Sequence, residues 1–191
     1  MGTVSEHTLV ALVQDKPGVL NRVASMFRRR GFNISSLTVS HSELPDQSRM
    51  TFVVKGDDAV VEQVTKQLYK LIDVLRVSDL SNQNIVAREM ALLKVPTTVH
   101  TRSEVIQIVD VFRANIVDVA TDSLIIEVTG DETKIDSLYE LLKPFGIKEM
   151  MRTGRVAMTR GKVSSAAPES PRGRGNGTKA ARKYEDYDMI L

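Results

Sequence analysis

The sequence predicts an α+β protein built from two ferredoxin-like βαββαβ units and a flexible tail. The first observation behind this prediction is an internal repeat, in which segment 52–58 aligns with segment 126–132 at an offset of 74 residues. The second is that strand-like and helix-like segments follow the same order in both halves. The third is the composition: 191 residues, 42% apolar and 26% charged, can bury one moderate core or two small ones.

The first unit begins with an apolar strand over 8–13, followed by a helix with Val19, Val23, Met26 and Phe27 on one face. Strands over 33–40 and 49–55 come next, linked by a polar loop that contains Pro45 and Asp46. A second helix carries Val61, Val64, Leu68 and Leu71 on one face, and a strand over 74–80 closes the unit.

The second unit repeats this order. A strand over 90–95 precedes a helix with Val105, Ile108, Val109 and Phe112 on one face. Strands 116–120 and 124–129 flank the turn Thr121-Asp122-Ser123, and a helix with Ile135, Leu138, Leu142 and Phe145 leads to a strand over 147–152. The boundary near 81–84 gives domains over 1–81 and 82–160, followed by a tail over 161–191.

Residues at the helix ends agree with these assignments. Pro17 suits a first helical turn, where a missing N–H costs nothing, and Gly31 after three arginines suits a helix C-terminus. Thr101 and Glu104 have the spacing of a capping box. Acidic residues at 57, 58, 131 and 132 suit the positive ends of the second helix of each unit.

Charge and composition exclude several classes of function. The formal net charge of +2 comes from the tail, where 161–191 has six basic and four acidic residues, which leaves 20 of each sign elsewhere. A neutral body lacks the basic face that nucleic acid requires, so we expect no nucleic-acid partner. The longest apolar run, 9–13, is five residues, and no signal-peptide pattern is visible. We therefore expect no membrane partner and a cytoplasmic location.

The sequence offers no catalytic constellation. There is no cysteine, which excludes disulfides, thiolate chemistry and cysteine-ligated zinc. His7, His41 and His100 are far apart and are better explained as ordinary surface or strand-end residues than as metal ligands. No nucleophile with an adjacent base, phosphate loop or dinucleotide motif is present, so we expect neither a catalytic residue nor a metal site.

One local motif suggests binding. The turn Asp15-Lys16-Pro17-Gly18 joins a buried strand to a helix start, where free N–H groups attract an anion. A free amino acid fits this arrangement, with its carboxylate at the helix end, its ammonium at Asp15 and its side chain near Val19 and Ile34. Asn33 would add a donor and an acceptor. The alternative is purely structural: Asp15 caps the helix, Gly18 packs tightly and Asn33 bonds a turn.

The motif Asp15-Lys16-Pro17-Gly18-Val19-Leu20 also carries a family resemblance, together with segments 30–39, 48–51, 66–75, 112–113 and 116–119. The first unit resembles an ACT domain, the small amino-acid-sensing module. The whole of 6–161 resembles the regulatory (small) subunit of acetolactate synthase, also called acetohydroxyacid synthase.

This resemblance implies a chain with no chemistry and no cofactor of its own. It implies a large catalytic subunit that carries thiamine diphosphate, magnesium and FAD. The chain would activate that partner and confer feedback inhibition by valine in the biosynthesis of valine, leucine and isoleucine.

The resemblance also implies a homodimer that forms through the ACT domains, with the valine sites at their interface. The ligand positions carried over from the family fall on six residues: Asp15, Gly18, Val19, Leu20, Asn33 and Ile34. Many relatives have Asn at the position of Asp15; a carboxylate there favours the ligand's ammonium and repels its carboxylate.

The second unit has Val95-Pro96-Thr97-Thr98 where the first has its glycine turn. We therefore expect it to serve dimer or catalytic-subunit contacts rather than to bind an amino acid in the same way. Two other interpretations remain. RNA-recognition motifs share the βαββαβ order, but their third strand needs two stacking aromatics, and here Phe52 stands alone and is expected to point inward. An ACT protein can also be a standalone sensor or regulate another enzyme.

Overall fold

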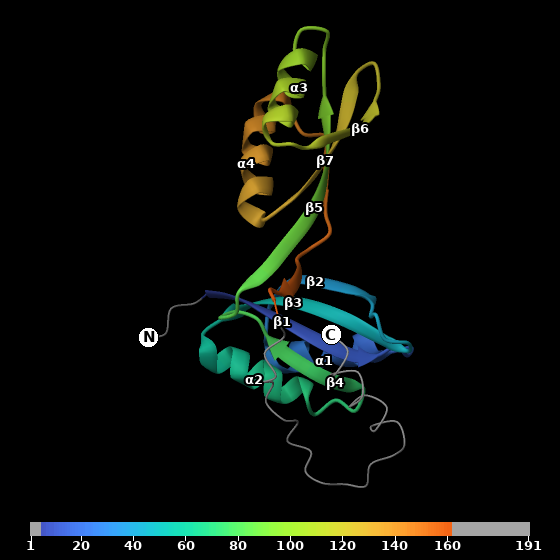
Figure 1. The fold of residues 1–191 in the computed structure, drawn as a ribbon, viewed down its shortest axis with the longest axis vertical. Coiled ribbons are helices and arrows are strands. Elements are labelled where there is room, and N and C mark those ends of the chain that lie inside the picture. The colour runs from blue at the N-terminus through green and yellow to red at the C-terminus, as the bar shows by residue number, and fades with distance from the viewer. Residues whose placement is uncertain (1–4, 162–191) are drawn as a thin grey trace.

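The computed structural model describes residues 5–161, so the expected tail over 161–191 lies outside the described residues apart from Gly161. Two α/β units lie one above the other along the long axis of the molecule (Figure 1). The N-terminal unit contains β1 (Ser5–Gln14), α1 (Val19–Arg30), β2 (Ile34–His41), β3 (Gln47–Gly56), α2 (Asp58–Leu68) and β4 (Val74–Asp79). Its strands form an antiparallel sheet in the order β2-β3-β1-β4, as expected for a ferredoxin-like unit.

The C-terminal unit repeats this architecture. It contains β5 (Ile85–Pro96), α3 (Arg102–Val111), β6 (Asn115–Val119), β7 (Ser123–Gly130), α4 (Glu132–Leu142), the short 3-10 helix η1 (Lys143–Phe145), β8 (Glu149–Arg152) and β9 (Val156–Thr159). The strand order β6-β7-β5-β8 matches that of the first sheet, with β9 as an additional strand on β5. The predicted fold class is therefore confirmed in both units.

Each unit has its own core between its helices and one face of its sheet. In the N-terminal unit, Phe52 is fully buried and stacks on Phe27 of α1, with ring centroids 5.3 Å apart. The inward orientation expected for Phe52 is confirmed, and no stacking surface for RNA bases remains at this position. The predicted apolar faces of the second helices are also buried, through Val61, Val64 and Leu68 in α2 and Ile135, Leu138 and Leu142 in α4.

Helix ends follow the predicted chemistry in three of five places. Asp57 accepts a hydrogen bond from the Val60 N–H at 2.9 Å, and Asp131 accepts one from the Lys134 N–H at 2.8 Å. Gly31 ends α1 with a φ of 69° after three arginines. The expected position of Pro17 in the first turn of a helix is wrong, because α1 begins two residues later, at Val19.

The expected capping box at Thr101 is also wrong. Thr101 has helical backbone angles and its side chain does not cap α3. Instead the hydroxyls of Thr98 and Thr101 each accept a hydrogen bond from the other residue's N–H, at 3.2 and 2.9 Å. The loop before α3 is therefore closed by a threonine pair.

Several strands differ from their predicted extents, and β9 was not expected. The strand predicted over 90–95 starts at Ile85, and the one predicted over 147–152 is confined to Glu149–Arg152. The first half of β5 pairs with β9, in the register Ala87↔Ala157. The chain therefore turns back toward the N-terminal unit after β8.

The ribbon formed by the first half of β5 and β9 covers part of the helix-free face of the N-terminal sheet. Ala157 packs against Val10 and Leu80, with Ile85 and Ala87 at the edge of this small cluster. Residues from both ends of the described chain thus share one apolar contact. The remaining free edges of the N-terminal sheet are those of β2 and β4.

Candidate functional site

The loop between β1 and α1 forms a tight turn that requires glycine. The Val19 N–H donates to the Lys16 carbonyl at 3.3 Å, and Gly18 has φ 84° and ψ −4°. These angles match the third position of a type II turn, where Pro at the second position and Gly at the third are preferred. Gly18 is therefore fixed by backbone geometry, whatever else it does.

The first turn of α1 is left open. No side chain caps this helix, and among residues 5–161 the backbone N–H groups of Gly18, Leu20 and Asn21 find no acceptor. Unsatisfied N–H groups at a helix N-terminus carry partial positive charge and bind anions. The structural alternative required Asp15 to cap this helix, and Asp15 does not do so.

The side chains around this turn differ in accessibility. Val19 is 3% exposed and belongs to the core, whereas Leu20 is 45% exposed. The apolar surface that a ligand could touch here is therefore that of Leu20, and Val19 can offer only its backbone.

Arg22 lies beside the turn and was missed by the sequence analysis. Its Nε donates to the Asp73 carboxylate at 2.7 Å, and its Nη1 would lie 3.5 Å from a Cβ placed on Gly18. The cation thus adds to the positive character of the helix end, although Asp73 offsets part of it. No pattern in the sequence joins residues 22 and 73, because the contact depends on how α2 leads into β4.

Acidic groups also gather at this end of the sheet. An Asp15 carboxylate oxygen lies 3.1 Å from the His41 Nδ1, and the Asp15 N–H donates to the Asp46 carbonyl at 2.8 Å. In the same loop, a backbone hydrogen bond, aided by the Ser42 hydroxyl, lowers the pKa of the Glu43 carboxyl. An ammonium group would find negative charge here, next to the open amides.

Asn33 and Ile34 lie at the other end of the same sheet. Ile34 pairs with Val54 of β3, which pairs with His7 of β1, whereas Asp15 follows Gln14 at the far end of β1. The strand position level with Ile34 is therefore seven residues from Gln14 along β1, which at the rise of a β-strand is roughly 24 Å. The six predicted ligand residues therefore form two groups within one chain, with Asp15, Gly18, Val19 and Leu20 in one and Asn33 and Ile34 in the other.

A second copy of the chain could bring the two groups together. Among the described strands, β2 lies at the edge of its sheet with one side unpaired, and it runs from Ile34 to His41. If two copies pair β2 antiparallel around a two-fold axis, Ile34 of one copy lies beside His41 of the other. His41 already touches Asp15, so each end of such a pair would contain one group from each copy.

The corresponding loop of the C-terminal unit is partly closed. The N–H groups of Thr101 and Arg102 both donate to Thr98, and the Arg102 guanidinium donates to the carbonyls of Ala120 and Thr121. Among residues 5–161, the N–H groups of Ser103 and Glu104 find no acceptor, so α3 leaves two such groups where α1 leaves three.

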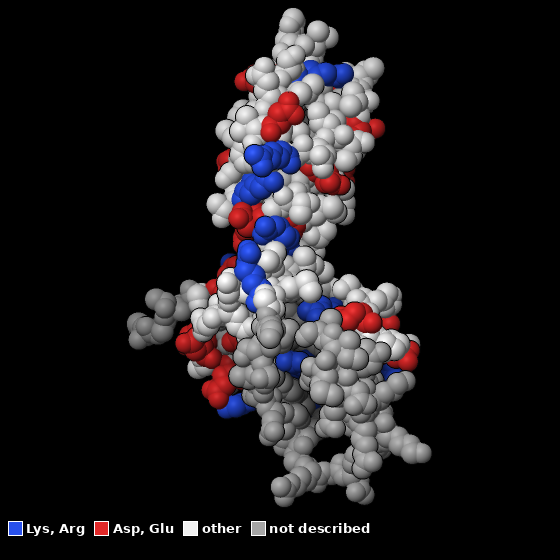
Figure 2. Space-filling model, viewed as in Figure 1, with Lys and Arg blue, Asp and Glu red and all other residues white. Residues whose placement is uncertain are grey.

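Other kinds of site have no support in the described residues. Within 5–161, no group of three or more potential ligands could hold a metal ion, and no helix is long and apolar enough to span a membrane. In Figure 2, basic side chains form a narrow run down the C-terminal unit to the neck, with acidic side chains beside it. The described part of this face has no broad basic surface of the kind that nucleic acids need.

Comparisons with known proteins agree on one family. The family model described as an AHAS small subunit-like ACT domain matches residues 9–76, and the model described as the small subunit of acetolactate synthase matches 88–161. The probable acetolactate synthase small subunit of Archaeoglobus fulgidus is 55% identical over 156 residues, which make up 82% of this chain and 98% of that protein. The acetolactate synthase small subunit of Bacillus subtilis is 51% identical over 164 residues, or 85% and 95% of the two chains.

A solved structure is also similar. The crystal structure of the acetolactate synthase small subunit from Thermotoga maritima has a TM-score of 0.79 and 46% sequence identity to this chain. The match covers 83% of this chain and 99% of that one. The similarity therefore extends over both units and nearly the whole length of these relatives.

Proposed function

Because the chain belongs to the acetolactate synthase small-subunit family, we propose that it is a regulatory subunit with no chemistry of its own. It binds the large catalytic subunit, raises its activity and confers feedback inhibition by valine. Thiamine diphosphate, magnesium and FAD belong to that partner. The complex acts in the cytoplasm, in the biosynthesis of branched-chain amino acids.

The observation that carries the proposal is the open N-terminus of α1. Its unpaired N–H groups at Gly18, Leu20 and Asn21 suit the carboxylate of an amino acid, and Arg22 adds positive charge. Asp15 suits the ammonium group, and exposed Leu20 suits an aliphatic side chain. All three parts of valine thus have a matching group in one place.

Asn33 and Ile34 of a second copy complete the site. The position of β2 at the edge of its sheet and the split of the ligand residues into two groups support a homodimer that forms through the edges of the ACT sheets, with two equivalent valine sites. The ribbon of β5 and β9 covers part of the helix-free face of this sheet, so the edge of the sheet is more accessible to a second copy than the face. In this arrangement valine contacts both copies, so pairing of the copies and valine binding strengthen each other.

The two units divide the work. Residues 1–81 form the ACT domain that binds valine, and residues 82–160 form a regulatory domain that contacts the catalytic subunit or the second copy. Valine rigidifies the paired ACT domains and shifts the catalytic partner, with a coupling of about 1–3 kcal/mol.

Reconstitution tests this proposal. The purified chain is mixed with the large subunit of acetolactate synthase, and pyruvate consumption is measured as valine is added. We expect the chain to raise the activity and valine to lower it again. If the chain neither binds the large subunit nor changes its rate, the proposed function is wrong.

A further inference from the structure

The segment Thr153, Gly154 and Arg155, which joins β8 to β9, is hydrogen-bonded to both units. On the C-terminal side, the Thr153 N–H donates to the Met90 carbonyl at 3.0 Å. On the N-terminal side, the Arg155 N–H donates to the Ser36 hydroxyl at 3.1 Å, and the Thr38 hydroxyl donates to the Thr153 carbonyl at 3.4 Å. Ser36 and Thr38 belong to β2, so the segment is attached to the strand that begins at Ile34.

Gly154 allows this segment to lie directly against β2. Its φ is 86°, and a Cβ at this position would lie 2.6 Å from the Ser36 hydroxyl oxygen and 3.0 Å from that of Thr38. A larger residue would force the Ser36 hydroxyl to move as well as strain its own backbone. The segment therefore packs closely against β2 at Gly154.

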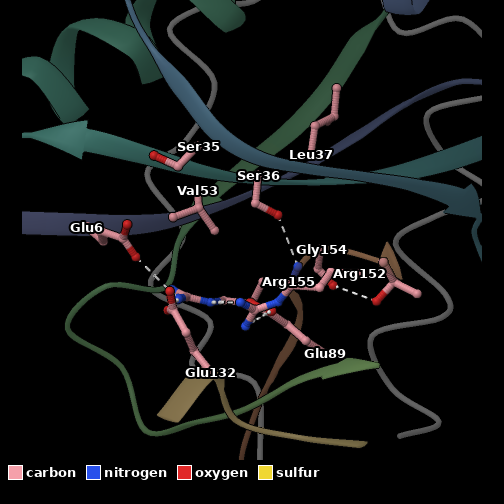
Figure 3. A pocket seen from close by; sticks show the side chains of 11 residues that line it. Glu6, Ser35, Ser36, Leu37, Val53, Glu89, Glu132, Arg152, Gly154 and Arg155 are labelled. Carbon is pink, nitrogen blue, oxygen red and sulfur yellow. Dashed lines mark hydrogen bonds and ion pairs between the residues drawn. The ribbon is translucent and has the colours of Figure 1, made fainter. Parts of the chain in front are cut away.

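Arg155 reinforces the contact with a partly buried charge network at a cleft of about 360 Å³ (Figure 3). Its guanidinium lies 3.3 Å from Glu6 of β1 and 2.7 Å from Glu132 at the start of α4. It also donates to the Thr8 hydroxyl at 3.2 Å and lies 3.8 Å from the largely buried Glu89 of β5. One side chain, itself 18% exposed, thus joins carboxylates from both units.

Arginine suits this role because its planar guanidinium can contact several carboxylates at once. Arg152 supplies a second cation to Glu89 at 3.1 Å, and Lys55 supplies one to Glu6 at 3.5 Å. Those contacts each stay within one unit. Arg155 is the residue whose loss would separate the two sets of charges.

We propose that segment 153–155 clamps the C-terminal unit onto the N-terminal sheet, with the Arg155 side chain on β1 and Gly154 on β2, so that a displacement of this sheet caused by ligand binding reaches the C-terminal unit. This inference rests on the proposed function for the ligand, because Asn33 and Ile34 at the start of β2 are part of the proposed valine site. The clamp itself needs no ligand. Arg155 is a positioning residue, since it acts on the partner only through the orientation of the C-terminal unit.

The clamp can be tested directly by spin-label distance measurements on the full chain. The sequence has no cysteine, so labels on Gln63→Cys in α2 and Gln107→Cys in α3 report only the separation of the two units. Labelled chain is diluted with excess unlabelled chain, which removes pairs between copies. We expect Arg155→Met and Gly154→Ala to broaden the distance distribution without ligand. Arg76→Met, which removes an exposed arginine that has no ion pair among residues 5–161, should leave it unchanged.

Transmission is tested by comparing valine binding with valine inhibition in the complex. In Arg155→Met we expect calorimetric valine affinity to stay at the wild-type value while the valine effect on pyruvate consumption weakens about 2- to 30-fold. Arg155→Lys should restore part of the effect, because it keeps the charge but not the fork of donors. A loss of fold alone would instead lower affinity and inhibition together.

Three results separate the possible failures. An unchanged distance distribution in both variants overturns the clamp. Wild-type inhibition in Arg155→Met, or a parallel loss of affinity and inhibition, overturns transmission through it. If the wild-type chain binds no valine, the proposed function is wrong, and the distance distribution still decides whether the clamp exists.

Discussion

The Asp15 carboxylate and the His41 imidazole lie 3.1 Å apart, joining the loop after β1 to the last residue of β2. This contact places a carboxylate beside the open N-terminus of α1 and at the end of the edge strand. In the proposed site, the ammonium group of the bound amino acid faces Asp15. Asp15 should therefore set the orientation of the ligand.

Asp15→Asn should change how much the carboxylate and the ammonium group of the ligand each contribute to its affinity. Loss of the negative charge removes repulsion of a carboxylate near the helix end, so isovalerate, which lacks the ammonium group, should bind about 2- to 5-fold more tightly. Isobutylamine, which lacks the carboxylate, should bind more weakly. Calorimetry with both compounds measures this, and Asp110→Asn in α3 serves as the control. The same shift for both compounds would contradict the proposed orientation.

Gly18→Ala should cost stability and valine affinity together. A φ of 84° strains any residue with a Cβ, at about 1–2 kcal/mol, which urea unfolding measures. Gly146→Ala is a matched control with the same φ in the C-terminal unit. It should lose at least as much stability but keep valine affinity. Equal loss of affinity in both variants would mean that strain alone is responsible.

Asn33→Ala should abolish valine inhibition and spare activation of the catalytic subunit, because Asn33 belongs to the proposed ligand site and not to the partner contact. Pyruvate consumption with and without valine measures both properties. If both survive intact, the site is misplaced.

A mixture of Gly18→Ala and Asn33→Ala chains should recover binding that neither variant shows alone. Each proposed site takes Gly18 from one copy and Asn33 from the other, so a mixed pair contains one intact site. Random pairing at equal amounts restores about a quarter of all sites. Calorimetric stoichiometry after subunit exchange measures this, and no recovery would place both residues in one chain's site.

Phe52→Ala should destabilise the N-terminal unit by about 3–5 kcal/mol, because it empties the centre of the core and removes the stack on Phe27. Phe32→Ala, which changes a partly buried ring at the core edge, should cost less. Urea unfolding followed by circular dichroism measures the difference. A loss below about 1 kcal/mol would place Phe52 outside the core.

Deletion of 162–191 should leave valine binding and activation unchanged. The small-subunit family model ends at residue 161, and a match of only 156 residues covers 98% of the Archaeoglobus fulgidus relative. Calorimetry and pyruvate consumption with the shortened chain test this. A drop in either would assign the segment a part in function.

The sequence predicts the cores well because apolar periodicity is a local property. The stripes at Val61, Val64 and Leu68 and at Ile135, Leu138 and Leu142 are both buried, as their spacing indicates. The sequence does not predict β9, because a four-residue strand forms only when a partner strand is present, here the first half of β5. Ala157 of β9 contacts Val10, which lies near the other end of the described residues, and no local sequence pattern indicates such a distant contact.

The candidate site shows the same limit. The glycine turn and the open helix end are visible in the motif, because both depend on residues 15–20. The separation of Asn33 from Gly18 is not, since it depends on the parallel direction of β1 and β2 on either side of β3. Arg155 gave no signal at all, because its side-chain partners come from three distant places in the sequence: β1, β5 and the start of α4.

The strand β9 also has a consequence for biosynthesis. Val10 and Leu80 leave the ribosome long before Ala157, which covers them in the finished protein. At about 5–20 residues per second, the patch stays exposed to solvent for roughly 4–15 s while translation proceeds. During that interval the nascent N-terminal half offers an apolar sheet face to chaperones, and its folding is finished by one of the last strands to be synthesised.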